Sequence, residues 1–129
     1  MMLKKTLKSY PFSSFILCVI LFLSLMPIPE TELSDVPFVD KWTHIAMYGG
    51  FSLVLWFESL RQVHHNCKSM TTWSISAFMP VVLSGILELL QEYATNCRSG
   101  EWWDMLANTL GVVLASIVAC TILRRLLNK

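Results

Sequence analysis

Four long apolar stretches, separated by polar loops, constrain this chain more than any other feature. They cover approximately residues 11–27, 42–60, 72–91 and 104–123. Each holds about 16 to 20 residues, near the length that an α-helix needs to cross a bilayer. Only 15% of the residues are charged, against about 25% in an ordinary soluble domain. The sequence therefore predicts an all-α, four-helix integral membrane bundle that forms a single domain over residues 1–129.

Local signals mark where these stretches begin, end and bend. The basic N-terminus followed by an apolar run is typical of a signal peptide, but Met-Pro-Ile-Pro-Glu-Thr follows without a small-x-small cleavage site. We therefore predict a retained first transmembrane helix. Asp40 suits the N-terminal end of the second helix, where an acid is favourable. Pro80 should kink the third, which membrane helices tolerate when a neighbour satisfies the freed carbonyl.

The distribution of Lys and Arg predicts the orientation. Most of them lie at the termini or in the middle loop: Lys4, Lys5, Lys8, Arg61, Lys68, Arg124, Arg125 and Lys129. Lys41 and Arg98 are the exceptions, and of the acids only Glu58 falls away from the side that holds these two. Because positive residues favour the cytoplasmic side, we expect both termini in the cytoplasm and four crossings of the membrane.

This topology brings polar residues from three helices to one extracytoplasmic end. Helical spacing places His44, Tyr48 and Ser52 on one face, and it does the same for Glu88 with Gln91. A carboxylate near hydrocarbon is costly and by default faces the bundle interior with a partner. The predicted layer contains Asp40, Lys41, His44, Tyr48, Glu88, Gln91, Arg98, Asp104 and Asn108.

Two interpretations of this layer remain open. It could be a clamp between helices, in which Glu88 pairs with Arg98 or Lys41 and Asn108 bonds to Gln91, since polar groups commonly join membrane helices. We favour a polar pocket that opens outward, because the layer holds more groups of both signs than one clamp needs. Below it, Gly111 and Ala115 form a small-xxx-small pair that permits close helix packing.

The chemistry of such a pocket has several possibilities. His44 with Glu88 or Asp104 could act as an acid–base pair, which makes these three the candidate catalytic residues. The same groups form an incomplete metal set, so no metal and no cofactor are predicted. Lys41 and Arg98 could hold a phosphate group. The cysteines lack metal-ligand spacing and a disulfide framework is not expected, while a net charge of +1 gives no indication of nucleic acid.

Three ordered motifs resemble the VanZ-like family of small bacterial membrane proteins. They are Asp-Lys-x-x-His-x-x-x-Tyr at 40–48, Glu-x-x-Gln at 88–91 and Arg-x5-Asp-x3-Asn-x2-Gly at 98–111. The founding member of that family is associated with resistance to the glycopeptide antibiotic teicoplanin. Where the family often has a second glycine after Gly111, this chain has Ala115. The resemblance implies a location in the bacterial inner membrane and a role in the cell envelope, with the residues of the three motifs at the site.

These observations lead to three functional hypotheses. The first is a membrane protein whose outer pocket binds or modulates an anionic lipid or a lipid-linked cell-wall precursor, with an effect on glycopeptide susceptibility. The second is an enzyme acting on such a precursor with His44 or Glu88 as acid or base. The third, a proton or solute pathway, ranks last because the cytoplasmic halves of the last two helices are too apolar. The sequence does not indicate the oligomeric state.

Overall fold

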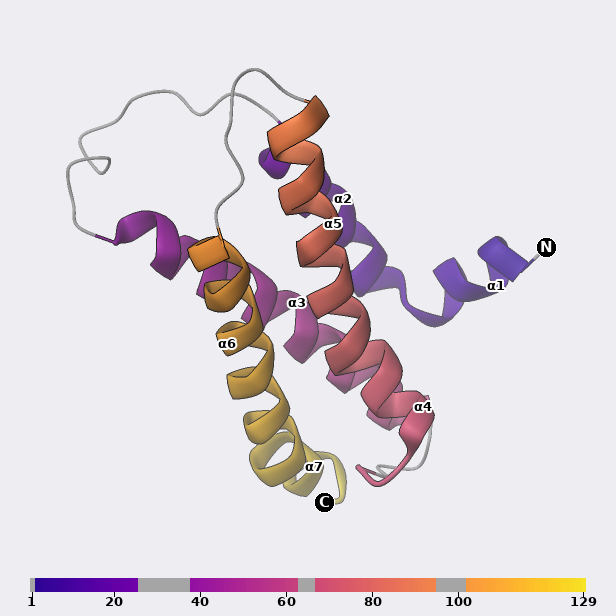
Figure 1. The fold of residues 1–129 in the computed structure, drawn as a ribbon. Coiled ribbons are helices and arrows are strands. Elements are labelled where there is room, and N and C mark those ends of the chain that lie inside the picture. Colours follow the sequence, from indigo (N-terminus) through magenta and orange to yellow (C-terminus); the bar gives the residue numbers. More distant parts are fainter. Residues whose placement is uncertain (1, 26–37, 63–66, 95–101) are drawn as a thin grey trace.

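The computed structural model describes residues 2–25, 38–62, 67–94 and 102–129, and every regular element among them is a helix (Figure 1). For these residues the predicted all-α class is confirmed. Two helical segments, Met70–Tyr93 and Trp102–Leu127, are long and apolar enough to cross a membrane. They coincide with the third and fourth predicted stretches, and their length and composition are those of a membrane protein.

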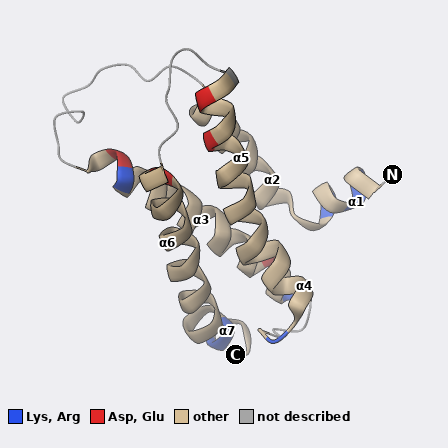
Figure 2. Cartoon of the chain, viewed as in Figure 1, with Lys and Arg blue, Asp and Glu red and all other residues tan. Residues whose placement is uncertain are grey.

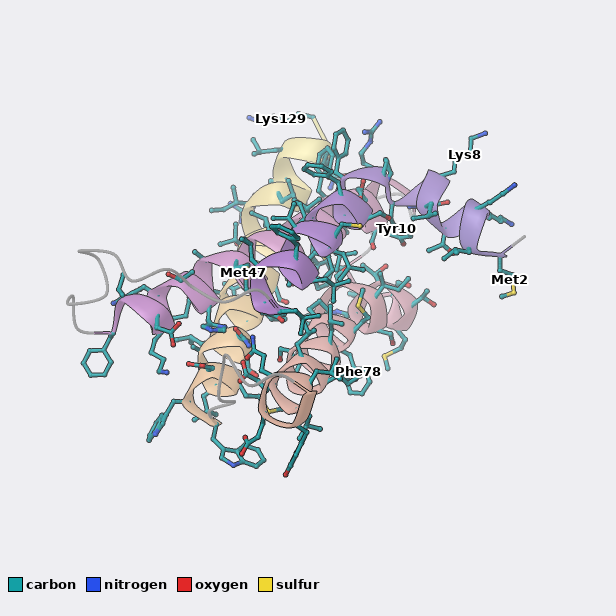
Figure 3. The ribbon with its side chains drawn as sticks, turned by 90° about the horizontal axis from the view of Figure 1, so that it is seen from above. Met2, Lys8, Tyr10, Met47, Phe78 and Lys129 are labelled. Atoms are coloured by element: carbon teal, nitrogen blue, oxygen red, sulfur yellow. The ribbon has the colours of Figure 1, made fainter. Side chains whose placement is uncertain are left out.

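The N-terminal part of the chain forms two helices instead of one. α1 (Met2–Ser9) and α2 (Pro11–Leu25) meet at an angle of 100°. Pro11 opens α2, a position where the missing N–H of proline removes no hydrogen bond. Figure 3 shows α1, with Met2 and Lys8, extending away from the bundle while Tyr10 lies at the bend. The sequence analysis did not predict α1, and the first predicted span corresponds to α2.

α3 (Val39–Gln62) is long enough to cross a membrane but is less apolar than the segments Met70–Tyr93 and Trp102–Leu127. Its predicted polar stripe of His44, Tyr48 and Ser52 is buried, and Glu58 and Ser59 extend the buried polar face toward the C-terminal end of the helix. The polar side chains of α3 therefore face neighbouring helices. Because these polar side chains are covered by other helices, α3 can lie inside the bundle although it is less apolar.

α6 (Trp102–Val118) packs along α3, and the two helices run in the same direction. Lys41 lies beside Asp104 at one end, and the Trp56 indole donates to the Ser116 hydroxyl at 3.0 Å toward the other. Between these points the backbones are very close, because a Cβ on Gly111 would overlap the backbone carbonyl of α3. This confirms that Gly111 permits close packing. The helix continues through η3 (Ala119–Leu123), a π-helical turn, and α7 (Arg124–Leu127).

α4 (Met70–Trp73), the π-helical turn η2 (Ser74–Phe78) and α5 (Met79–Ala94) form the remaining long segment. Pro80 cannot donate to the carbonyl of Ser76, four residues earlier. The Ser52 hydroxyl of α3 donates to that carbonyl instead. The expectation that a neighbour satisfies the freed carbonyl is thus confirmed, and this bond joins α3 to η2.

Contacts between helix ends show that α2, α3, α5 and α6 alternate in direction. The start of α2 meets the end of α3 through Ser13 and Glu58, and its end meets the end of α5 through Ser24 and Gln91. The interior is rich in small and polar side chains, whereas many large apolar side chains are exposed. Examples on the outer faces are Phe12, Phe15, Phe22, Phe78, Ile86, Leu89, Leu106, Leu110 and Ile117.

Charged residues separate along the bundle. Figure 2 shows acidic residues at the start of α3, the end of α5 and the start of α6, with basic residues on α1, beside α4 and at α7. Lys41 shares the acidic end. At the basic end, Cys67 packs against Cys120, and both thiols are free. The long helices thus present one acidic end and one basic end, with the buried Glu58 as an acid near the basic end.

Candidate functional site

Two aspartates, a lysine and a histidine meet where α3 and α6 begin. The Lys41 ammonium forms an ion pair with Oδ1 of Asp104 and lies 3.5 Å from Oδ2 of Asp40. The other carboxylate oxygens face His44, whose Nε2 lies 3.7 Å from Oδ1 of Asp40 and 3.7 Å from Oδ2 of Asp104. Each aspartate therefore bridges a cation and an imidazole. We call these four residues the aspartate–histidine cluster.

Local geometry explains why these side chains converge. Asp40 and His44 are four residues apart on α3, so they share one helix face. Asp104 lies in the first turn of α6, where an acid interacts favourably with the helix N-terminus. The close packing at Gly111, two turns further along, holds this first turn against α3. The cluster is thus positioned by two rigid helices.

Asn108 of α6 forms a hydrogen bond with the histidine. Its Oδ1 lies 2.9 Å from Nδ1 of His44, and its side chain is fully buried. Its Nδ2 is also buried and has no hydrogen-bond partner in the part of the chain that the structure describes. The bond between Asn108 and Gln91 that the clamp interpretation included is not formed: the Asn108 oxygen pairs with His44, its Nδ2 has no partner among the described residues, and Gln91 donates to the carbonyl of Ser24 at 2.7 Å.

Tyr48 and Glu88 lie next to the cluster. Tyr48 is buried one helical turn beyond His44, within electrostatic range of the Glu88 carboxylate on α5. Ser84, Glu88 and Gln91 are all buried, as expected for one inward face of α5. The structure therefore brings the predicted residues of α3, α5 and α6 to the same end of the bundle.

Glu88 also edges a groove between α5 and α6 with a volume of about 430 Å³. The groove is lined by Gly85, Ile86, Glu88, Leu89, Glu92, Tyr93, Trp102 and Met105. Most of this lining is apolar or aromatic, and two carboxylates interrupt it. Met105 lines the groove and the preceding residue, Asp104, belongs to the cluster, so the first turn of α6 separates the two features.

One predicted residue cannot be placed. Arg98, the second expected cation, lies outside the described residues. A pairing of Glu88 with Arg98 thus stays a prediction. Lys41 is placed, and its described partners are the two aspartates of the cluster.

The sequence analysis missed two contributions to this end of the molecule. It paired His44 with Glu88 or Asp104 and did not pair it with Asp40, although the four-residue spacing of Asp40 and His44 was a usable signal. It also left out Glu92, Tyr93 and Trp102, which line the groove. Their position at helix ends gives no pattern in the sequence that distinguishes a groove from a membrane interface.

The arrangement defines what the site can do chemically. The cluster offers an imidazole nitrogen between two carboxylates, a geometry suited to moving a proton or holding a cation. The groove offers an apolar wall with carboxylates at one side, which suits a ligand with an apolar chain and a polar head. Comparison of the chain with protein-family models, curated proteins and solved structures found no match.

Proposed function

We propose that this chain is a multi-pass protein of the bacterial inner membrane that crosses four times, with both termini in the cytoplasm. Two helices with the length and composition of membrane spans support this topology, as do the alternating directions of α2, α3, α5 and α6. The outward-facing large apolar residues would contact lipid. The basic end would lie in the cytoplasm and the acidic end outside.

We further propose that the extracytoplasmic end binds an anionic lipid or a lipid-linked cell-wall precursor, as a VanZ-like protein of the envelope. The observation that carries this proposal is that the buried Glu88 edges the groove between α5 and α6. The groove leaves space beside Glu88 for part of a ligand. In the proposed complex the lipid chain lies along the apolar wall of the groove, and Glu88 and Glu92 accept hydrogen bonds from head-group hydroxyls or amines.

Lys41 and Arg98 would bind the phosphate of such a ligand. The two aspartates of the cluster fix the direction of the Lys41 side chain, and that side chain is 24% exposed, so it can still reach a ligand. A pre-positioned cation loses less conformational entropy on binding than a free surface lysine does. By the VanZ-like resemblance, occupation of this site would alter teicoplanin susceptibility.

Binding of a short-chain polyprenyl diphosphate to the purified protein in phosphatidylcholine nanodiscs tests this proposal. We expect the Lys41→Ala, Arg98→Ala double variant to bind at least tenfold more weakly, because hydrogen bonds to charged groups contribute about 1.5–3 kcal/mol each. A Lys68→Ala, Lys129→Ala variant removes the same charge at the opposite end and should bind normally. Equal affinity in all three proteins would exclude the proposal, and the uncharged polyprenol measures the contribution of the chain alone.

The cluster favours one second candidate, an enzyme that acts on an envelope lipid or peptidoglycan precursor. Nε2 of His44 faces two carboxylates while Nδ1 is held by Asn108, which resembles the positioning of a general acid or base. Altered precursor chemistry in cells that express the protein, lost in a His44→Gln variant that still inserts, would support catalysis. Unaltered precursors in cells expressing the wild-type protein would exclude catalysis, and ligand binding would remain as the proposed function.

A further inference from the structure

Three potential metal ligands converge in the aspartate–histidine cluster. One donor atom each from Asp40, His44 and Asp104 lies within 4.8 Å of the other two. Two of these residues come from successive turns of α3 and the third from the first turn of α6. We infer that Asp40, His44 and Asp104 bind a divalent transition-metal ion. The inference stands on these side chains and does not depend on the ligand proposed for the groove.

The distances fit a shared ion better than a salt bridge. Nε2 of His44 lies 3.7 Å from an oxygen of each aspartate. A charge-assisted hydrogen bond between an imidazolium and a carboxylate would place these atoms about 2.7–2.9 Å apart. Two donors that are each about 2.1 Å from one ion stand about 3.0 Å apart at an octahedral angle and about 3.4 Å apart at a tetrahedral angle. The separation of His44 from each aspartate is therefore closer to that of two donors that share an ion.

The histidine is oriented as metal ligands are. Asn108 accepts a hydrogen bond from the Nδ1–H of His44 through its side-chain oxygen at 2.9 Å. This places the proton on Nδ1 and directs the Nε2 lone pair toward the two carboxylates. Metal-binding histidines commonly donate their second ring nitrogen to an oxygen in this way. No hydrogen bond from the described residues reaches Nε2, so the lone pair is available for coordination.

Lys41 contacts one oxygen of each aspartate, Oδ1 of Asp104 and Oδ2 of Asp40, and leaves the other oxygen of each facing His44. The ammonium therefore holds both carboxylates in place and also reduces their negative charge. The second effect weakens metal binding, so we expect a Lys41→Met variant to bind the ion more tightly than the wild type does. Three protein ligands leave coordination positions open for water or another molecule.

Mn²⁺ is the probe of choice, because two of the three ligands are carboxylates, which suit this ion. The full-length protein in phosphatidylcholine nanodiscs is stripped with a chelator and titrated with MnCl₂ by calorimetry. We expect one ion per chain. Asp40→Asn, at a half-exposed position that tolerates substitution, should lower the affinity at least tenfold. Glu92→Gln removes an exposed acid at the same end, outside the cluster, and should leave it unchanged.

A pulsed EPR measurement on the Mn²⁺ complex separates coordination from a structural effect. We expect magnetic coupling to one directly bound imidazole nitrogen in the wild type and its loss in His44→Gln. Failure of the wild type to bind Mn²⁺ would overturn the inference, as would equal affinity in Asp40→Asn and Glu92→Gln. Because no lipid diphosphate is present, these outcomes are independent of the binding experiment on the groove.

Discussion

The Glu58 carboxylate accepts a hydrogen bond from the backbone N–H of Phe12 at 3.0 Å, so a side chain of α3 caps the N-terminus of α2. The same carboxylate accepts the backbone N–H and the hydroxyl of Ser13. A helix N-terminus carries unsatisfied donors and a partial positive charge, both of which favour an anion. Glu58 thus fixes the point at which α1 and α2 meet at 100°.

Glu58→Ala should destabilise the protein by about 2–3 kcal/mol, because removal of the acceptor leaves the buried N–H of Ser13 and the partly buried N–H of Phe12 unsatisfied. Glu58→Gln should cost less, since one amide oxygen remains to accept. The measurement is thermal unfolding in detergent, followed by circular dichroism. Glu92→Ala is the control, because Glu92 is exposed at the other end of the bundle. A Glu58→Ala variant as stable as Glu92→Ala would show that the cap contributes nothing.

Gly111→Ala tests the packing of α3 against α6. A Cβ at this position would overlap the carbonyl oxygen of Ile45 and stand 3.0 Å from the backbone nitrogen of Gly49. Neither backbone group can move alone, so the helices must separate, and we expect destabilisation of about 1–3 kcal/mol. The separation should also weaken Mn²⁺ binding, because the cluster draws ligands from both helices.

Gly50→Ala is the matched control for this substitution. Gly50 lies in α3, the helix against which Gly111 packs, but a Cβ there would meet nothing within 4 Å. Alanine is preferred over glycine inside a helix by about 0.5–1 kcal/mol, so this variant should be as stable as the wild type or slightly more stable. If both alanine variants unfold at the same temperature, close approach at Gly111 is not what joins α3 to α6.

Lys41 and Asp104 should be energetically coupled. Removing one partner leaves the other charge with only its longer contact, Lys41 with Asp40 at 3.5 Å or Asp104 with His44 at 3.7 Å. Both single variants, Lys41→Met and Asp104→Asn, should therefore be less stable than the wild type. The double variant should recover about 1–3 kcal/mol of the summed loss, since neither charge has then lost its closest partner. The three variants are compared by chemical denaturation in one detergent. Additive effects would mean that the ion pair is not formed in the membrane-like environment.

The sequence predicted the helices well where apolarity and length agree. The stretches 72–91 and 104–123 correspond to Met70–Tyr93 and Trp102–Leu127 because a continuous apolar run has few alternatives to a helix. α1 was missed because its 8 residues are too few to show a reliable period. α3 is less apolar than predicted for a span, since its polar groups are satisfied by neighbours that the sequence alone does not place.

The sequence predicted which site residues share a helix face, but it did not predict which of them contact one another across helices. Spacing of three or four residues correctly placed His44 with Tyr48 and Glu88 with Gln91 on buried faces. It could not fix the rotation of one helix against another, and for this reason it could not decide whether Asn108 bonds to Gln91, as the clamp interpretation had it, or to His44, as the structure shows. The role of Glu58 had no local signal either, because its partners Phe12 and Ser13 are more than forty residues away in the sequence.

The four-crossing topology predicts which positions a membrane-impermeant maleimide can reach in intact spheroplasts. In a variant with all four native cysteines replaced by alanine, single cysteines at Phe38 and Trp102, which are highly exposed, should react from outside. A cysteine at Lys129 should react only after permeabilisation, because the basic end lies in the cytoplasm. Labelling is read by a gel shift. Reaction of the Lys129 position in intact spheroplasts, or protection of Phe38 and Trp102, would contradict the topology and move the aspartate–histidine cluster to the cytoplasmic side.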